Sequence, residues 1–223
     1  MTVFVFDLDD TLYEEITFVR SGFRAVAGYL SQEFKVSANE AFRKMWSALE
    51  QKGRGSVFNE VLRDYGLETQ RNIRKSLSVY RQHIPQIKLL EDAEQVLQRL
   101  PEGSAYIVTD GNKLVQHSKV QALGLYPRIK KCFITYRYGR AHSKPSPYCF
   151  QKISQIEKRP PADIVYIGDN PNKDFIGIKP LGFRTIQIKR GPYSNLKLSE
   201  RYCAEAEVDH LLEIFDVIHQ WKV

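Results

Sequence analysis

The chain has 223 residues, 43% of them hydrophobic, which is enough to bury a full core and to carry one small additional subdomain. It contains no run of 18 apolar residues and enters a core strand at once without the features of a signal peptide, so we expect an intracellular, cytoplasmic protein with no membrane partner. The formal charge of +7 is spread over several segments, which disfavours nucleic acid as the partner. Three cysteines without a Cys-x-x-Cys spacing disfavour a zinc site or a disulfide framework.

The first predicted element is a strand over residues 3–6, which runs directly into two carboxylates, Asp7 and Asp9. In extended backbone, side chains two residues apart point to the same side, so both carboxylates would face one point in space. Two like charges at this separation raise one pKa or recruit a cation. A bare Asp-x-Asp after a strand is more often an Asp-rich turn with Thr11 as a helix cap, and only the later motifs decide between these interpretations.

Residues 15–87 form a long segment in which apolar residues recur at helical spacing and no strand pattern intervenes. One stripe of such residues is Phe18, Phe23, Val26, Ala27 and Leu30. We interpret these residues as part of the core of a helical bundle. The segment also holds one loop with both glycines and a cation, Gly53-Arg54-Gly55-Ser56. Arg54 is therefore a candidate for substrate contact, although an exposed turn between helices explains this loop equally well.

Beyond Pro85 the pattern changes to short apolar runs that alternate with helical segments. Strands are predicted near residues 105–109, 132–135, 163–168 and 184–188. Helices are predicted near residues 92–100, 113–123, 145–157 and 173–181. Pro180 should end or kink the last of these helices early. Such alternation predicts an α/β domain with a parallel sheet and right-handed crossovers, formed by residues 1–14 and 88–223.

A hydroxyl stands at the end of the second predicted strand, where Thr109 precedes the turn Asp110-Gly111. The Thr109 hydroxyl and the free main-chain N–H groups of Asp110 and Gly111 would together form an anion site. The Asp110 carboxylate would place a negative charge near that anion unless it points away or caps the helix that follows.

Charged groups also follow the third and fourth predicted strands. Lys144 lies at the end of a loop, directly before Pro145, which suits the first turn of a helix. The fourth strand ends in Gly168 and Asp169, and Asp174 follows five residues after Asp169. Each feature is common by itself, but all of them stand at strand ends of one predicted parallel sheet, where they would meet at a single edge.

Taken in order, these residues resemble the four motifs of the haloacid dehalogenase superfamily of aspartate-nucleophile hydrolases. The matching residues are Asp7, Asp9, Thr11 and Leu12 for the first motif, Thr109 for the second, Lys144 for the third, and Gly168, Asp169 and Asp174 for the fourth. The resemblance implies a doubly wound parallel sheet with the motifs at the carboxyl ends of its strands. It also implies that residues 15–87 are a small α-helical cap subdomain inserted after the first strand.

The resemblance further implies a role for each motif residue. Asp7 would attack phosphorus and form an aspartyl-phosphate, and Asp9 would act as the general acid and then as the base. Mg²⁺ would be held by Asp7, the main-chain carbonyl of Asp9 and Asp169, with Asp174 supporting its waters. Lys144 and Thr109, with the N–H groups of Asp110 and Gly111, would bind the phosphoryl oxygens.

Several functions remain open from the sequence. Asp9 argues against carbon–halogen cleavage, because a halide leaving group needs no proton. A phosphatase acting on a small phosphorylated metabolite, either a nucleoside monophosphate or a sugar phosphate, is the default. A phosphomutase acting on a sugar phosphate uses the same carboxylate pair and is the first alternative. A non-catalytic binding or regulatory module, on nucleic acid for example, is an alternative from a different class.

Substrate choice depends on residues outside the motifs. Tyr13 follows the nucleophile loop and, like Arg54, is a candidate for contact with the leaving group. Besides Pro180, two positions depart from the family pattern, since Asp110 and Lys173 stand where close relatives usually have Asn. Lys173 would either pair with the adjacent Asp174 or loosen the metal loop.

Overall fold

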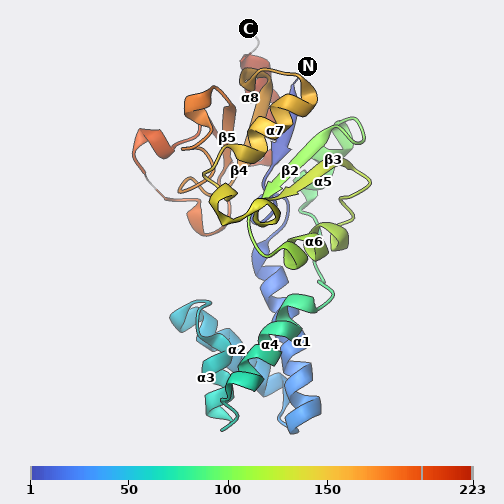
Figure 1. The fold of residues 1–223 in the computed structure, drawn as a ribbon, viewed down its shortest axis with the longest axis vertical. Helices are drawn as coiled ribbons and strands as arrows, with labels where there is room; N and C mark the ends of the chain where they lie inside the picture. The colour runs from blue at the N-terminus through green and yellow to red at the C-terminus, as the bar shows by residue number, and fades with distance from the viewer. Residues whose placement is uncertain (1, 197, 222–223) are drawn as a thin grey trace. The chain divides into compact units, whose positions relative to one another are not determined.

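The computed structural model describes residues 2–196 and 198–221, and the chain divides into two compact units. One unit runs up to Glu15 and continues from Lys88 onward, and the other unit is Ile16–Ile87 (Figure 1). The strands of the described chain all belong to the first unit, and the second unit is helical.

The first unit is built on a sheet of six described strands in which every neighbouring pair is parallel. In chain order the strands are β1 (Val3–Phe6), β2 (Ala105–Thr109), β3 (Ile129–Ile134), β4 (Ile164–Gly168), β5 (Arg184–Ile188) and β6 (Ala206–Val208). Their order across the sheet is β3-β2-β1-β4-β5-β6, so the first strand lies inside the sheet (Figure 1). The chain thus winds outward from β1 in both directions, and the predicted doubly wound parallel sheet is confirmed.

Helices cover both faces of this sheet. They are α5 (Glu91–Arg99), α6 (Lys113–Ala122), α7 (Tyr148–Glu157) and α8 (Ile214–Gln220). Because alternate residues of a strand point to opposite faces, Val5 lies in one core cluster with Phe150 of α7, whereas the Phe4 ring lies 6.0 Å from that of Phe215 on α8. Strands β2 and β4 are buried at every position, which explains their unbroken apolar sequences.

The helix predicted near residues 173–181 is not observed, and the described chain forms only the 3-10 helix Lys179–Leu181 there. Pro180 lacks the N–H that a continuing helix requires. Gly177 is packed against the main chain of another loop, because a Cβ atom there would lie 1.7 Å from the carbonyl oxygen of Pro145. Phe175 and Ile178 therefore reach the core from turns, although their spacing mimics a helix.

Two further predictions need correction, and one strand was not predicted. The helix predicted to begin at residue 145 begins at Tyr148, since residues before a proline are disfavoured in helical backbone and Pro145 and Pro147 both lie here. The strand predicted near residues 132–135 starts earlier, at Ile129, and includes two exposed lysines that hide its pattern. The sequence does not predict β6, whose three residues are too few for a clear alternation.

Short 3-10 helices occupy many of the connections in the first unit. Besides Lys179–Leu181 they are Thr135–Tyr138, Arg140–His142, Pro161–Asp163, Gly191–Tyr193, Glu200–Tyr202 and Leu211–Glu213.

The second unit consists of α1 (Glu15–Phe34, whose first residue belongs to the other unit), α2 (Ala38–Lys52), α3 (Val57–Asp64) and α4 (Gln70–Gln82). Each helix contributes to one buried cluster, to which Phe23, Met45, Val61 and Ile73 belong. Arg54 lies exposed in the turn between α2 and α3. Nowhere in the described residues is a helix both long enough and apolar enough to span a membrane.

Candidate active site

The carboxyl ends of three adjacent strands bring the predicted motif residues together. Asp7 follows β1, Thr109 ends β2 and Asp169 follows β4, and because these strands are parallel and adjacent their ends lie along one edge. The main-chain N–H of Asp7 donates to the carbonyl oxygen of Ile167 at 2.8 Å, which extends the pairing of β1 with β4 into the loop. Asp7, Thr109 and Asp169 are all buried.

Three buried carboxylates form a cluster at this edge. Asp7, Asp169 and Asp174 each offer one oxygen, and these oxygens all lie within 4.8 Å of one another. Burial raises the pKa of Asp7 to about 6, although the Lys144 ammonium opposes the shift. Burial and the charges of Asp7 and Asp174 raise the pKa of Asp169 to about 9. Such clustering is costly without cations, and a set of oxygen donors suits a hard divalent cation such as Mg²⁺.

Lys144 supplies a buried positive charge to this cluster. Its Nζ lies 2.8 Å from Asp7 Oδ2 and 2.8 Å from Asp174 Oδ1, and it donates to the Tyr166 hydroxyl at 2.8 Å. Burial opposes its charge, but the carboxylates of Asp174 and Asp7 outweigh burial and raise the pKa of Lys144 well above its ordinary value. Asp174 also accepts from the main-chain N–H of Asn170 at 2.9 Å, so it fixes both the lysine and the loop after Asp169.

Asp9 lies beside this cluster and its carboxylate is held by side chains on both oxygens. Lys119 Nζ lies 2.6 Å from Oδ1, which also accepts from the Tyr13 hydroxyl. The Gln116 amide donates to Oδ2 at 2.9 Å. Burial favours the neutral acid, but the Lys119 ammonium and the hydrogen bonds from Lys119, Tyr13 and Gln116 outweigh it and lower the pKa of Asp9. Tyr13, predicted as a leaving-group contact, is fully buried against Asp9.

The Asp110 carboxylate is tied to neighbouring loops. Asp110 Oδ1 accepts from the Thr135 hydroxyl at 2.6 Å and from the main-chain N–H of Lys144 at 3.2 Å. Lys173 Nζ lies 3.6 Å from Asp110 Oδ2, so the lysine pairs with Asp110, a partner that neither of the two sequence-based alternatives for Lys173 included. The side chain of Asn112 caps α6, so Asp110 does not fill that role. Asp110 and Lys173, the two positions at which the resemblance leads us to expect Asn, thus face each other with opposite charges.

Thr11 does not cap the first helix, so the alternative interpretation of the first motif, an Asp-rich turn with Thr11 as the helix cap, is wrong on this point. The main-chain N–H of Glu15, where α1 begins, donates to Asp10 Oδ1 at 2.9 Å. The Thr11 hydroxyl oxygen is buried and has no hydrogen-bond partner among the described residues. Asp10 adopts a left-handed backbone conformation with φ 51°, which Asp tolerates better than most residues.

Sequence reasoning missed Tyr166, Gln116 and Lys119. Tyr166 carries the one hydroxyl in the buried strand β4, and a buried tyrosine hydroxyl usually has a hydrogen-bond partner, which was an available signal. Gln116 and Lys119 lie three residues apart on α6, on one side of the helix. Both residue types are common on exposed helix faces, so the sequence did not distinguish them.

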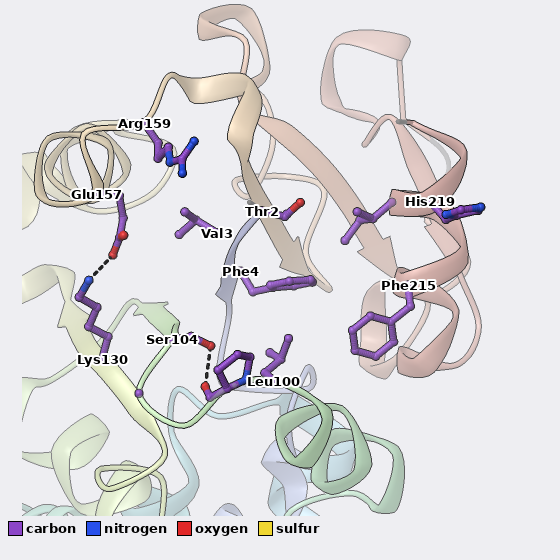
Figure 2. A pocket seen from close by; sticks show the side chains of 13 residues that line it. Thr2, Val3, Phe4, Leu100, Ser104, Lys130, Glu157, Arg159, Phe215 and His219 are labelled. Carbon is purple, nitrogen blue, oxygen red and sulfur yellow. Dashed lines mark hydrogen bonds and ion pairs between the residues drawn. The ribbon is translucent and has the colours of Figure 1, made fainter. Parts of the chain in front are cut away.

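The predicted site does not coincide with the cavity shown in Figure 2, which has a volume of about 630 Å³. Phe4, Ser104 and Phe215 are among the residues that line it, and Figure 2 shows Lys130 and Glu157 paired at its wall. Its lining includes the start of β1 and the segment before β2, and it contains none of the motif residues. This cavity therefore lies at the amino ends of the strands, away from the carboxylate cluster.

Comparison with known proteins identifies the family. The family model of the haloacid dehalogenase-like hydrolases matches residues 1–182. The chain is 26% identical to the glyceraldehyde 3-phosphate phosphatase of Methanocaldococcus jannaschii, over 98% of this chain and 97% of that protein. It is 24% identical to the protein of the same name from Pyrococcus furiosus, over 98% of this chain and 93% of that protein.

Solved structures agree with this fold. The 2-haloacid dehalogenase of Pseudomonas syringae superposes with a TM-score of 0.67 at 22% identity, covering 99% of this chain and all of that one. A haloacid dehalogenase-type phosphatase from Thermococcus onnurineus superposes with a TM-score of 0.60 at 21% identity, covering 98% of each chain. The chain belongs to the haloacid dehalogenase-like hydrolase family. The Methanocaldococcus and Pyrococcus proteins that match its sequence are named phosphatases, and the prediction that the chain is a phosphatase is confirmed.

Proposed function

We propose that this enzyme is a Mg²⁺-dependent phosphomonoesterase that transfers the phosphoryl group of its substrate to Asp7 and then to water. One observation carries the proposal: the Asp7 carboxylate is buried with a lysine ammonium at 2.8 Å and with two further carboxylates whose oxygens lie within 4.8 Å of its own. A nucleophilic carboxylate needs nearby positive charge to approach a phosphate dianion, and Lys144 supplies part of it. The carboxylate cluster supplies a site for a cation, which would bring the rest.

The oxygens of Asp7 and Asp169, with the main-chain carbonyl of Asp9, are our proposed Mg²⁺ ligands. When bound, Mg²⁺ would neutralise charge between the nucleophile and the phosphate. Asp174 contacts Lys144 and accepts from the main-chain N–H of Asn170, so its proposed role is to hold the Lys144 ammonium and the loop that carries Asp169 in place. Thr109 and the N–H groups of Asp110 and Gly111 are proposed to bind the phosphoryl oxygens at the end of β2.

Two displacements complete the reaction. In the first, an Asp7 oxygen attacks phosphorus, the bond from phosphorus to the ester oxygen breaks, and Asp9 donates a proton to the leaving alkoxide. In the second, ionised Asp9 removes a proton from water, the water oxygen attacks phosphorus, and the bond to Asp7 breaks. The hydrogen bonds that stabilise ionised Asp9 match its state in the second displacement. The negative charge of the bound phosphate dianion favours protonation of Asp9 before the first displacement.

The substrate is proposed to be a small phosphorylated metabolite, and the relatives favour a sugar or triose phosphate over a nucleotide. The relatives are named glyceraldehyde 3-phosphate phosphatases and align along nearly the whole of this chain. The helical unit Ile16–Ile87 is proposed to act as the cap that reads the leaving group, with Arg54 as a candidate contact. Location in the cytoplasm also remains our proposal.

Phosphate release tests the proposal. Glyceraldehyde 3-phosphate, hexose phosphates and nucleoside monophosphates would be compared with Mg²⁺, with EDTA, and with Asp7→Asn. We expect release that requires both the metal and Asp7 and that is fastest on sugar or triose phosphates. Formation of an isomeric sugar phosphate in place of inorganic phosphate would indicate a mutase. A folded wild-type enzyme that releases nothing from any of these esters would contradict the proposal.

A further inference from the structure

Two polar side chains on α6, Gln116 and Lys119, are buried beside the proposed site, and the mechanism above uses them only as hydrogen-bond donors to ionised Asp9. Gln116 is 2% exposed and Lys119 is 3% exposed, although residues of these types are rarely buried without partners. Lys119 carries a formal charge into this position, which is costly unless the charge is paired. Their partners are the two groups that the mechanism needs to orient, Thr109 and Asp9.

The Gln116 amide joins these two groups. Its Nε2 donates to Asp9 Oδ2 at 2.9 Å and to Thr109 Oγ1 at 2.6 Å, which uses both hydrogens of the amide nitrogen. The Thr109 oxygen is thus an acceptor toward Gln116, and its own proton must point elsewhere. That proton is then available to donate to a phosphoryl oxygen. Gly111 leaves room for this arrangement, because a Cβ there would lie 3.3 Å from Gln116 Cγ.

Lys119 fixes the other oxygen of the same carboxylate. Its Nζ lies 2.6 Å from Asp9 Oδ1 and 3.7 Å from Glu15 Oε1, so it is held between the nucleophile loop and the start of α1. With Oδ1 held by Lys119 and Oδ2 held by Gln116, the carboxyl plane of Asp9 cannot turn without breaking a hydrogen bond in a buried place. An acid that must reach one leaving oxygen gains from such restraint.

We propose that Gln116 and Lys119 are positioning residues for proton transfer, which orient Asp9 toward the leaving oxygen and the Thr109 hydroxyl toward the phosphoryl group. The inference rests on the proposed phosphatase mechanism and extends it to α6. Its consequence is specific: loss of either side chain should slow the cleavage of esters whose leaving group needs a proton far more than the cleavage of esters whose leaving group does not.

The experiment compares two substrates by kcat/KM, which reports the first displacement. One is glycerol phosphate, whose alkoxide is a strong base, and the other is p-nitrophenyl phosphate, whose phenolate leaves without a proton. For Lys119→Met and Gln116→Met we expect a loss of about 100-fold on glycerol phosphate and less than about tenfold on p-nitrophenyl phosphate, because general acid catalysis contributes about 10²–10⁴-fold only where a proton is transferred. Lys119→Arg, which keeps the charge, should recover most of the activity on glycerol phosphate.

Matched controls make the same chemical changes at exposed positions. Gln121 is exposed on the same helix, and Lys158 is exposed at the end of α7. Gln121→Met and Lys158→Met should each change kcat/KM by no more than about twofold on either substrate, as surface substitutions usually do. Equal losses on the two substrates in both Lys119→Met and Gln116→Met would overturn the inference. If Lys119→Met does not fold by circular dichroism, Gln116→Met decides alone. An inactive wild-type enzyme, or an active Asp7→Asn variant, would instead overturn the phosphatase mechanism itself.

Discussion

Replacement of Lys144 by Met tests whether the buried lysine is the counter-charge of the carboxylate cluster. Lys144 Nζ lies 2.8 Å from both Asp7 and Asp174, and its removal takes away the ammonium that contacts two of the three clustered carboxylates. Loss of one partner from a buried ion pair costs about 3–5 kcal/mol of unfolding free energy. We expect a loss of that size in Lys144→Met in the presence of EDTA.

Mg²⁺ should reduce this loss. A ligand that binds only the folded state adds about 2.7 kcal/mol at a concentration 100 times its Kd, and the more negative site of Lys144→Met should bind the ion more tightly than the wild type does. The assay is urea unfolding, with and without Mg²⁺, followed by fluorescence and by circular dichroism. Lys158→Met, at an exposed position, is the control. A metal-free loss below about 1 kcal/mol, in the range of exposed pairs, would refute this account of the cluster.

Three further predictions concern the same loops. Because burial raises the pKa of Asp7 to about 6 and that of Asp169 to about 9, the folded metal-free protein holds these protons more tightly than the unfolded chain. The unfolding free energy of the metal-free protein should therefore fall as pH rises from about 4 toward 9. Urea unfolding in EDTA at several pH values measures it, and an unfolding free energy that rises over this range would contradict the raised pKa values of Asp7 and Asp169. A double-mutant cycle of Asp110→Asn and Lys173→Asn should give a coupling of about 0.2–1 kcal/mol in urea unfolding, since this ion pair is partly exposed; zero coupling would mean that the two departures from the family pattern are independent. Gly177→Ala should destabilise the protein by about 1–3 kcal/mol or more, because its Cβ would meet a carbonyl oxygen at 1.7 Å, and an unchanged thermal midpoint would exclude that close packing.

Much of the sheet follows from sequence because buried parallel strands are short apolar runs. Strands β2 and β4 are buried throughout, and their sequences admit few other interpretations. The error after β4 has a local cause: Phe175 and Ile178 have helical spacing, but Gly177 is pinned against another loop and Pro180 blocks the continuing hydrogen bonds. The conformation of such a segment depends on its contacts with a distant loop, and the hydrophobic pattern of the segment itself carries no information about those contacts.

The proposed site also contains residues that the sequence predicts and residues that it does not. The motif residues lie at strand ends, so the sheet topology alone brings Asp7, Thr109 and Asp169 together. Gln116 and Lys119, which contact Thr109 and Asp9, could not be assigned to the site from sequence, because α6 exposes its apolar Leu114 at 56% and buries these two polar residues. A hydrophobic periodicity assigns the apolar side of a helix to the core, and α6 follows it at Val120 but not at Gln116 and Lys119, which are buried because Asp9 and Thr109 supply polar partners.

The nucleophile is the centre of the proposed mechanism, and it can be observed directly. The enzyme would be mixed with its fastest substrate and Mg²⁺, quenched in acid during turnover, and digested for mass spectrometry. We predict a phosphoryl group on the peptide that contains Asp7, absent when Asp7 is replaced by Asn or when EDTA replaces the metal. Turnover without any phosphorylated peptide, together with an active Asp7→Asn variant, would show that water attacks the substrate directly and would contradict the mechanism.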